Sequence, residues 1–486
     1  MNKALCIVGA LMLPFFMRAG AQEKWAVHEW GTFTSLQDEA GRAIGGINTD
    51  DEPVPAFVHR LDNFAMLNPS DVPQSFFKGA PACHPDVTMR LETPVVYFHP
   101  PAGQAGLQTA TVAVKFHGGW LSEFFPDADA YAPGLKDRTN HFPHLLSSTE
   151  SRLEWKDLKI GGDWPVTNTT AHVWTSPRAV NAASVQTIGG ESERFLFYRG
   201  IAHINAPLKI SHDPNSGELL FRSQLENLPA DQPLTLPALW LVDILSGGKI
   251  AFRTLPPVAL NQDSKRYVAH TPAAFAPGDF SSGNLEKLKA SLLAALVKDG
   301  LYPDEAQALL NTWEVSYFKS TGLRVFFLVP RAWTDFYLPL DISVPADLNR
   351  VMVGRIELVT PAQRDGLQEI ARASTNEISQ TAGQLVAGFY GRLLSAITNQ
   401  TSAVQMQRFN DEMAQVNAGQ KPLSTMLSIP KSYQTYLDLG RFRNALILDE
   451  AKHHPTEGLA SFIAAYRLQA CQPLAISSQP PDVGKL

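Results

Sequence analysis

Near its N-terminus the chain reads Val27-His28-Glu29-Trp30-Gly31-Thr32-Phe33-Thr34, a run rich in aromatic and β-branched residues. Such residues favour β-strands, and a strand directs alternate side chains to opposite faces. The alternation predicts two sets of side chains: Val27, Glu29, Gly31 and Phe33 on one face, and His28, Trp30, Thr32 and Thr34 on the other. Each face then carries an ionisable group and an aromatic ring. A Glu buried there must be paired or neutralised.

Short apolar runs of the same kind continue to about Val268, separated by Gly, Pro, Asn and Asp. This spacing is typical of strands and turns. The clearest strand candidates are residues 93–99, 111–116, 194–198, 219–223, 239–244 and 249–253. The turn Leu245-Ser246-Gly247-Gly248 predicts a hairpin between the last two. Because no helical pattern separates these strands, an antiparallel β-sandwich-like body is favoured over parallel β-α-β winding.

Helical periodicity enters twice, first within residues 283–320 and again from Pro361 onward. Between these segments the chain returns to strand-like runs at 323–329, 336–342 and 351–359. We therefore predict an α+β protein with a signal peptide at 1–21 and a β-rich body at 22–360. A helical insertion lies at 283–320, a helical C-terminal domain at 361–471, and a loose tail at 472–486.

The first residues have the three parts of an export signal: Lys3, an apolar run at 4–17, and the small residues Ala19-Gly20-Ala21. The run is shorter than the about 20 residues that a membrane-spanning helix needs. We expect cleavage near Ala21 and a periplasmic or secreted mature chain. No later stretch is apolar for long enough to predict a transmembrane segment.

Composition narrows the range of partners. Lys and Arg number 41 against 47 Asp and Glu, which gives a net charge of −6. An acidic excess argues against nucleic acid and anionic membranes as main partners. Beyond the leader the cysteines are Cys83 and Cys471, and an oxidising compartment would permit a disulfide between them. Two unpaired thiols are the alternative.

Histidines are the main candidates for metal binding. The chain has 13 of them, and the familiar signatures of serine hydrolases, phosphate-binding loops, dinucleotide folds and zinc helices are absent. His117, His141 and His144 form a loop set that could supply nitrogen ligands to zinc or copper. The alternative is that they are ordinary exposed loop histidines.

Charged residues within the predicted strands are the candidates for catalysis. His28 and Glu29 could act as an acid-base or ligand pair. The alternative is that Glu29 forms a structural bridge to Arg194, Arg199 or Arg355. Together with Glu193, these groups could line a cleft for a glycan or an anion, or could form a salt-bridge network inside the fold.

The run from His28 to Thr34 resembles the hallmark of a little-characterised group of exported bacterial proteins, which begin with His-Glu-Trp-Gly-Thr-Phe-Thr after a signal peptide. The likeness continues through residues 90–95, 119–123, 193–200 and 353–357, so it covers the β-rich body and not the C-terminal helices. The resemblance implies export and the extent of the body. It implies no catalytic residue.

Three classes of function remain open on these grounds. The first is a binding or scaffold protein of the cell envelope, with an envelope protein or a glycan as ligand. The second is a hydrolase acting on an envelope or extracellular polymer. The third is a zinc- or copper-dependent enzyme that uses His28 with the loop histidines His117, His141 and His144. The sequence assigns no cofactor.

Overall fold

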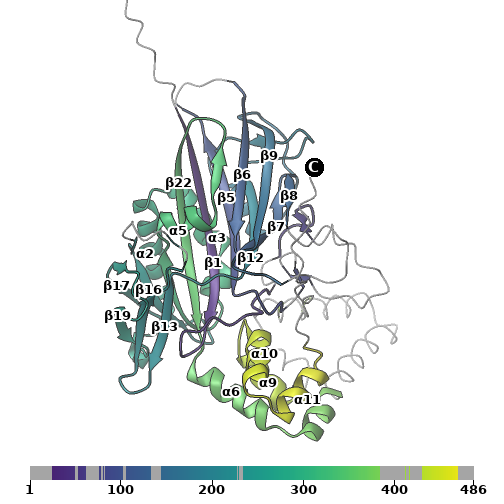
Figure 1. Ribbon diagram of the computed structural model, residues 1–486, viewed down its shortest axis with the longest axis vertical. Coiled ribbons are helices and arrows are strands. Elements are labelled where there is room, and N and C mark those ends of the chain that lie inside the picture. The colour runs from purple at the N-terminus through teal and green to yellow at the C-terminus, as the bar shows by residue number, and fades with distance from the viewer. Residues whose placement is uncertain are drawn as a thin grey trace, which may run out of the picture.

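A computed structural model of the protein describes residues 24–49, 53–61, 76–77, 80–81, 83–101, 106–132, 144–226, 228, 234–383, 411, 415 and 429–468. These residues form a mixed α/β fold in which most neighbouring strands are antiparallel (Figure 1). The expected signal peptide, Cys471 and the tail after it lie outside the described residues, as does the suggested pairing of Cys83 with Cys471.

A nine-stranded sheet forms the centre of the fold. Its order is β17 (Ile250–Leu255), β16 (Leu239–Ile244), β20 (Gly322–Leu328), β22 (Ala346–Leu358), β1 (Trp25–Gln37), β5 (Met89–His99), β12 (Leu196–Ala202), β7 (Gly119–Phe125) and β2 (His59–Arg60). β1 runs antiparallel to β5 but parallel to β22. The parallel pair corrects the expectation of a purely antiparallel body. No tight turn joins β1 to β22, so nothing local imposes the antiparallel direction that a hairpin would.

The predicted alternation of β1 is confirmed. Val27 and Phe33 belong to one apolar cluster, whereas Trp30 belongs to another on the opposite face of the sheet. Both faces are covered, because every residue of β1 except Ala26 is buried. The pairing of β1 with β5 shifts register between Trp30 and Thr32, and Thr93 there has a φ of 45°.

Further strands cover the face that carries Val27 and Phe33. A six-stranded sheet contains β11 (Ser192–Glu193), β10 (Val185–Gln186), β9 (Glu150–Ile160), β6 (Gln108–His117), β21 (Leu340–Ile342) and β8 (Asp129–Tyr131). Val112 and Trp155 of this sheet share a buried cluster with the two β1 residues. The two sheets therefore bury apolar side chains in a common core.

Smaller sheets complete the body. β13 (Leu208–Asp213), β14 (Glu218–Ser223) and β19 (Tyr267–Pro272) form a three-stranded sheet. Two strand pairs are β15 (Leu234–Leu236) with β18 (Val258–Leu260), and β3 (Phe76–Phe77) with β4 (Ala80–Pro81). The predicted hairpin between β16 and β17 is present, with Gly247 and Gly248 at φ values of 86° and 76°.

Helices cover the face of the nine-stranded sheet that carries Trp30. They are α1 (His172–Arg178), which the sequence did not predict, α2 (Asn284–Lys298), α3 (Pro303–Thr312) and α4 (Glu314–Phe318). A 3-10 turn, η2 (Pro277–Asp279), precedes α2. Leu288 of α2 and Leu309 of α3 pack in one cluster with Trp30 and Trp240. This packing carries the N-terminus of α3 to the end of the sheet at which β1 begins.

The predicted strand at 336–342 is wrong in its first half. Residues Arg331–Tyr337 form helix α5, and only Leu340–Ile342 form a strand. Pro330 precedes the first turn of this helix, a position where its missing N–H costs no hydrogen bond. Trp333 and Tyr337 are four residues apart and both buried, so helical spacing buries two large rings on one face.

Beyond β22 the described chain is helical, with α6 (Pro361–Arg372), α9 (Lys431–Asp438), α10 (Arg443–His453) and α11 (Glu457–Ala465). These helices lie at one end of the nine-stranded sheet, at the bottom of Figure 1. Leu367, Leu446 and Phe462 of the helices share a buried cluster with Leu36 and Val359. Among the described residues, no helix has both the length and the apolar character needed to cross a bilayer.

Candidate metal centre

Three side chains from three separate elements converge at one end of the nine-stranded sheet. They are His28 of β1, His99 at the end of β5, and Glu305 of α3. His28 Nδ1 lies 2.8 Å from Glu305 Oε2, and His99 Nε2 lies 2.9 Å from Glu305 Oε1. One ligand atom from each residue lies within 4.8 Å of the others.

Strand register brings the two histidines together. His28 pairs with Tyr97 and Ala26 pairs with His99 across the β1–β5 ladder. His28 and His99 are therefore diagonal neighbours on the same face of the sheet, within reach of one another. That face is the one covered by helices.

The start of α3 places the carboxylate. Pro303 begins the helix, and Glu305 Oε2 accepts a hydrogen bond from the backbone N–H of Tyr302 at 2.8 Å. This bond satisfies a donor that the first turn would otherwise leave free, which fixes the carboxylate. The Tyr302 ring lies against both imidazoles, with centroid distances of 4.5 Å to His28 and 4.8 Å to His99.

The centre is buried and polar. The side chain of Glu305 is 0% exposed, that of His28 is 7% exposed and that of His99 is 11% exposed. Burial alone would raise the pKa of the Glu305 carboxyl, but hydrogen bonds from His28 and His99 outweigh it and hold the pKa below 4.5. Glu305 is therefore a carboxylate at neutral pH, able to accept from imidazoles or to bind a cation.

Two imidazole nitrogens and one carboxylate form a donor set that suits zinc and other divalent transition metals. Metal-ligand distances of about 2.0–2.2 Å would place the three donor atoms roughly 3–3.6 Å apart. To admit an ion, the contacts of 2.8 Å and 2.9 Å would widen slightly, and the overall spread of the three donor atoms, up to 4.8 Å, would contract. Three protein ligands would leave coordination positions for water or a substrate, as catalytic zinc sites do.

Glu29 lies on the opposite face from His28, so the two residues do not meet as the suggested acid-base pair. Glu29 accepts a hydrogen bond from the Tyr198 hydroxyl and another from Arg350 Nε at 2.6 Å. Arg350 also contacts Asp335 at 2.9 Å. The geometry is the structural bridge considered above, with Arg350 as the partner in place of Arg194, Arg199 or Arg355.

The other catalytic candidates lie apart from the metal centre. Glu193 accepts from Trp174 Nε1 at 2.7 Å and from Arg178 Nε at 3.0 Å. The side chain of Arg194 is exposed to solvent. Arg199 Nη1 lies 3.4 Å from Glu123 Oε2, and Arg355 Nε lies 2.7 Å from Glu357 Oε1.

Arg199 and Arg355 belong to a buried band of charge that crosses the helical face of the sheet. Arg90, Arg199, Arg324 and Arg355 are among the largest fully buried side chains. Glu92, Glu123 and Glu357 supply carboxylates to the band. Burial lowers the pKa of the Arg324 guanidinium to about 10. The pairs Arg199–Glu123 and Arg324–Glu357 tie neighbouring strands. No residue of the band lines one of the described cavities.

The loop histidines proposed for zinc or copper lie elsewhere. His117 Nδ1 donates to the Phe336 carbonyl at 2.7 Å, and its Nε2 lies 3.0 Å from Glu150 Oε2. His144 pairs with Asp86 at 2.7 Å, and His141 lies outside the described residues. Within the described ranges, the one group of three metal-type ligands is His28, His99 and Glu305.

His99 and Glu305 are the functional candidates that sequence reasoning missed. His99 was only the last residue of a predicted strand, and Glu305 was only an acid in the first turn of a predicted helix. The signals available were the position of His99 at a strand end and an acid two residues after Pro303. No protein-family model matches this chain, and no curated protein matches it.

Proposed function

We propose that this chain is an exported protein of the periplasm or cell exterior, with a mainly antiparallel β-sandwich-like body and a helical C-terminal domain, and that it is metal-dependent. Its centre holds one divalent transition-metal ion, for which zinc is the first candidate, through His28, His99 and Glu305. The observation that supports this is the convergence of two imidazoles on one buried carboxylate. The ligand set differs from the loop histidines, of which His117 and His144 lie in separate ion pairs.

The metal serves either as the chemical centre of an enzyme or as the core of a binding site. The three ligands leave room for further coordination, and His99 retains contact with solvent. A glycoside hydrolase built on Glu29 and Glu193 gains no support, because each carboxylate is held by an arginine. The general acid and the general base of such a hydrolase must be able to exchange protons with the substrate, and carboxylates held in arginine ion pairs are not available for this.

A binding protein of the cell envelope is the second candidate. What favours it is a polar groove beside β13 and β14, which shares no lining residue with the metal centre and is rich in hydrogen-bonding side chains. A glycan is the class of ligand that such a lining suits.

Elemental analysis and zinc titration of the purified protein test the metal centre. We expect one equivalent of bound metal in the native protein. His99→Ala and Glu305→Gln should each weaken zinc binding by about 100-fold or more, because even loss of a supporting residue costs about 10–100-fold. The matched control is His117→Ala, which removes a histidine paired with a carboxylate outside the cluster.

Circular dichroism melting of each variant shows whether the fold is retained. If folded His99→Ala and Glu305→Gln keep their metal and folded His117→Ala loses it, the metal site lies at the loop histidines and not at this centre. A folded wild-type protein that holds no metal and binds no added zinc would overturn the proposal.

A further inference from the structure

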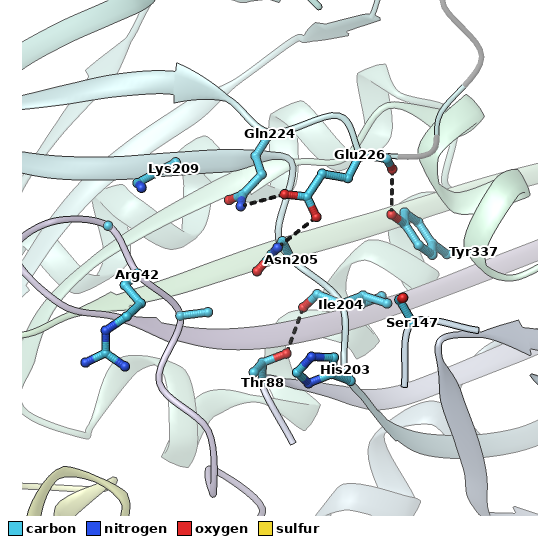
Figure 2. Close-up of a pocket in the computed structure, with 12 residues that line it drawn as sticks. Arg42, Thr88, Ser147, His203, Ile204, Asn205, Lys209, Gln224, Glu226 and Tyr337 are labelled. Atoms are coloured by element: carbon cyan, nitrogen blue, oxygen red, sulfur yellow. Dashed lines mark hydrogen bonds between the residues drawn. The ribbon is translucent and has the colours of Figure 1, made fainter. Parts of the chain in front are cut away.

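A polar cavity of about 390 Å³ lies where the loop after β12 meets β13 and the end of β14. Figure 2 shows Asn205, Gln224 and Glu226 pointing toward one another in it. Asn205 Nδ2 donates to Glu226 Oε2 at 3.0 Å, and Gln224 Nε2 donates to Glu226 Oε1 at 3.4 Å. The Tyr337 hydroxyl, also in the lining, donates to the backbone carbonyl of Glu226 at 3.0 Å and anchors this segment.

A second cavity of about 530 Å³ adjoins the first, because both are lined by Lys209, Gln224 and Glu226. The two neighbouring cavities are here called the polar groove. Each cavity alone lies in the size range of small-ligand sites, about 300–1,000 Å³. The groove therefore has room for more than one sugar-sized unit.

The charges of the groove are unbalanced. Its cations are Lys209, Arg222 and Lys265, with Arg42 at one end. The acid among the described lining residues is Glu226. Arg42 is already neutralised by Asp38 and Asp449. Lys209 and Lys265 form no ion pair with any described residue, and the Glu226 carboxylate is satisfied by two amides rather than by these cations.

Arg222 adds a directed donor. Its guanidinium lies 4.4 Å from the centre of the Tyr267 ring, and Nη2 donates to the Tyr267 hydroxyl at 2.5 Å. Its Nε is buried and donates to no group within the described part of the chain. No described carboxylate pairs with Arg222, so its positive charge is available to a ligand in the groove.

We propose that the polar groove binds an anionic saccharide, one that carries carboxylate or phosphate groups. Amides and hydroxyls of the lining hydrogen-bond the sugar hydroxyls, while Lys209, Arg222 and Lys265 meet the acidic groups. Glu226 is the carboxylate of the described lining and is held by two amides, so we assign binding of the saccharide to the groove. This inference deepens the second candidate function and is independent of the metal centre.

Isothermal titration of the purified protein with three probes tests the groove: trigalacturonate, mannose 6-phosphate and neutral maltotriose. We expect the acidic probes to bind more tightly than maltotriose and to weaken as ionic strength rises. The tighter of the two acidic probes distinguishes carboxylate from phosphate recognition. Lys209→Met should weaken the acidic probe by about tenfold, the equivalent of one charge-assisted hydrogen bond.

Lys298→Ala is the matched control, because this lysine is exposed on α2 and does not line the groove. It should bind like the wild type, as should His99→Ala of the metal centre. If maltotriose binds as tightly as the acidic probes, recognition of acidic groups is overturned, but the groove still binds saccharides and the second candidate function stands. Binding of none of the probes would remove both the groove and the second candidate function, and unchanged binding by folded Lys209→Met would place the ligand elsewhere.

Discussion

Glu29 shows how much of the charge in this protein is committed to holding strands together. Its side chain is 1% exposed, as is that of Arg350, and Arg350 Nε lies 2.6 Å from Glu29 Oε2. Two charges at this depth lose most of their hydration, so each depends on the other. The pair joins β1 to its parallel neighbour β22 at the strand where the fold is centred.

Replacing Glu29 with Gln should destabilise the protein by about 3 kcal/mol, because Arg350 would stay buried with only the half-exposed Asp335 as a counter-charge. Urea denaturation followed by fluorescence measures the loss. The control is Glu150→Gln. Because the Glu150 side chain is 51% exposed, this change should alter the free energy of unfolding by less than about 0.5 kcal/mol. A Glu29→Gln variant as stable as the control would show that the pair contributes nothing.

At the same scale, the site could be predicted only in part. His28 stood out because it lies in a strand run with unusual neighbours. Its partner Glu305 is 277 residues away, and His99 is 206 residues from Glu305. Contacts over such separations leave no trace in local spacing, so the ligand set required the three-dimensional packing of α3 on the sheet.

Single strands were easier to predict than their partners. The period-two pattern identified most of β1, β5, β16, β20 and β22, because alternation is a local property of the chain. Strand order is not local, and the parallel pairing of β1 with β22 could not be inferred from either strand alone. The strand prediction for residues 336–342 was wrong in its first half for a related reason: aromatic residues suit strands and buried helix faces equally well.

The register between β20 and β22 depends on a glycine. Gly354 pairs with Phe327, and a Cβ at Gly354 would lie 2.3 Å from the Phe327 ring. The Phe327 ring is fully buried, and its centroid lies 5.8 Å from that of the Phe33 ring, so it has little room to move. The absence of a side chain at Gly354 allows the ring to cover the strand.

Gly354→Ala should therefore destabilise the protein by about 2 kcal/mol through overpacking. The matched control is Gly278→Ala, where an added Cβ meets nothing within 4 Å. Thermal melting of both variants provides the comparison. Combining Gly354→Ala with Phe327→Leu should recover part of the loss, and no recovery would place the cause outside this contact.

For the whole molecule, the question is how the C-terminal helices are held to the body. Apolar residues of both parts share one buried cluster, and Arg364 of α6 adds a polar link. Its guanidinium donates to Glu39 Oε1 at 2.9 Å and Oε2 at 2.8 Å, and also to Glu450 of α10. Partial burial alone would raise the pKa of the Glu39 carboxyl, but the hydrogen bonds from Arg364 outweigh it and hold the pKa below 4.5.

A lowered carboxyl pKa means that the link stabilises the fold above the unfolded value of 4.5 and is lost as the pH falls through the folded value. Arg364→Met should cost about 1 kcal/mol near neutral pH, a modest value because Glu39 is partly exposed. The cost should shrink in acid, where Glu39 is protonated in both proteins. Urea midpoints at neutral pH and at a pH below the folded pKa of Glu39 measure it. Arg152→Met is the control, because Arg152 is half-exposed and pairs with Glu154 at the surface. A cost that stayed constant with pH would mean that the Arg364 stem, and not its charge, joins the helices to the body.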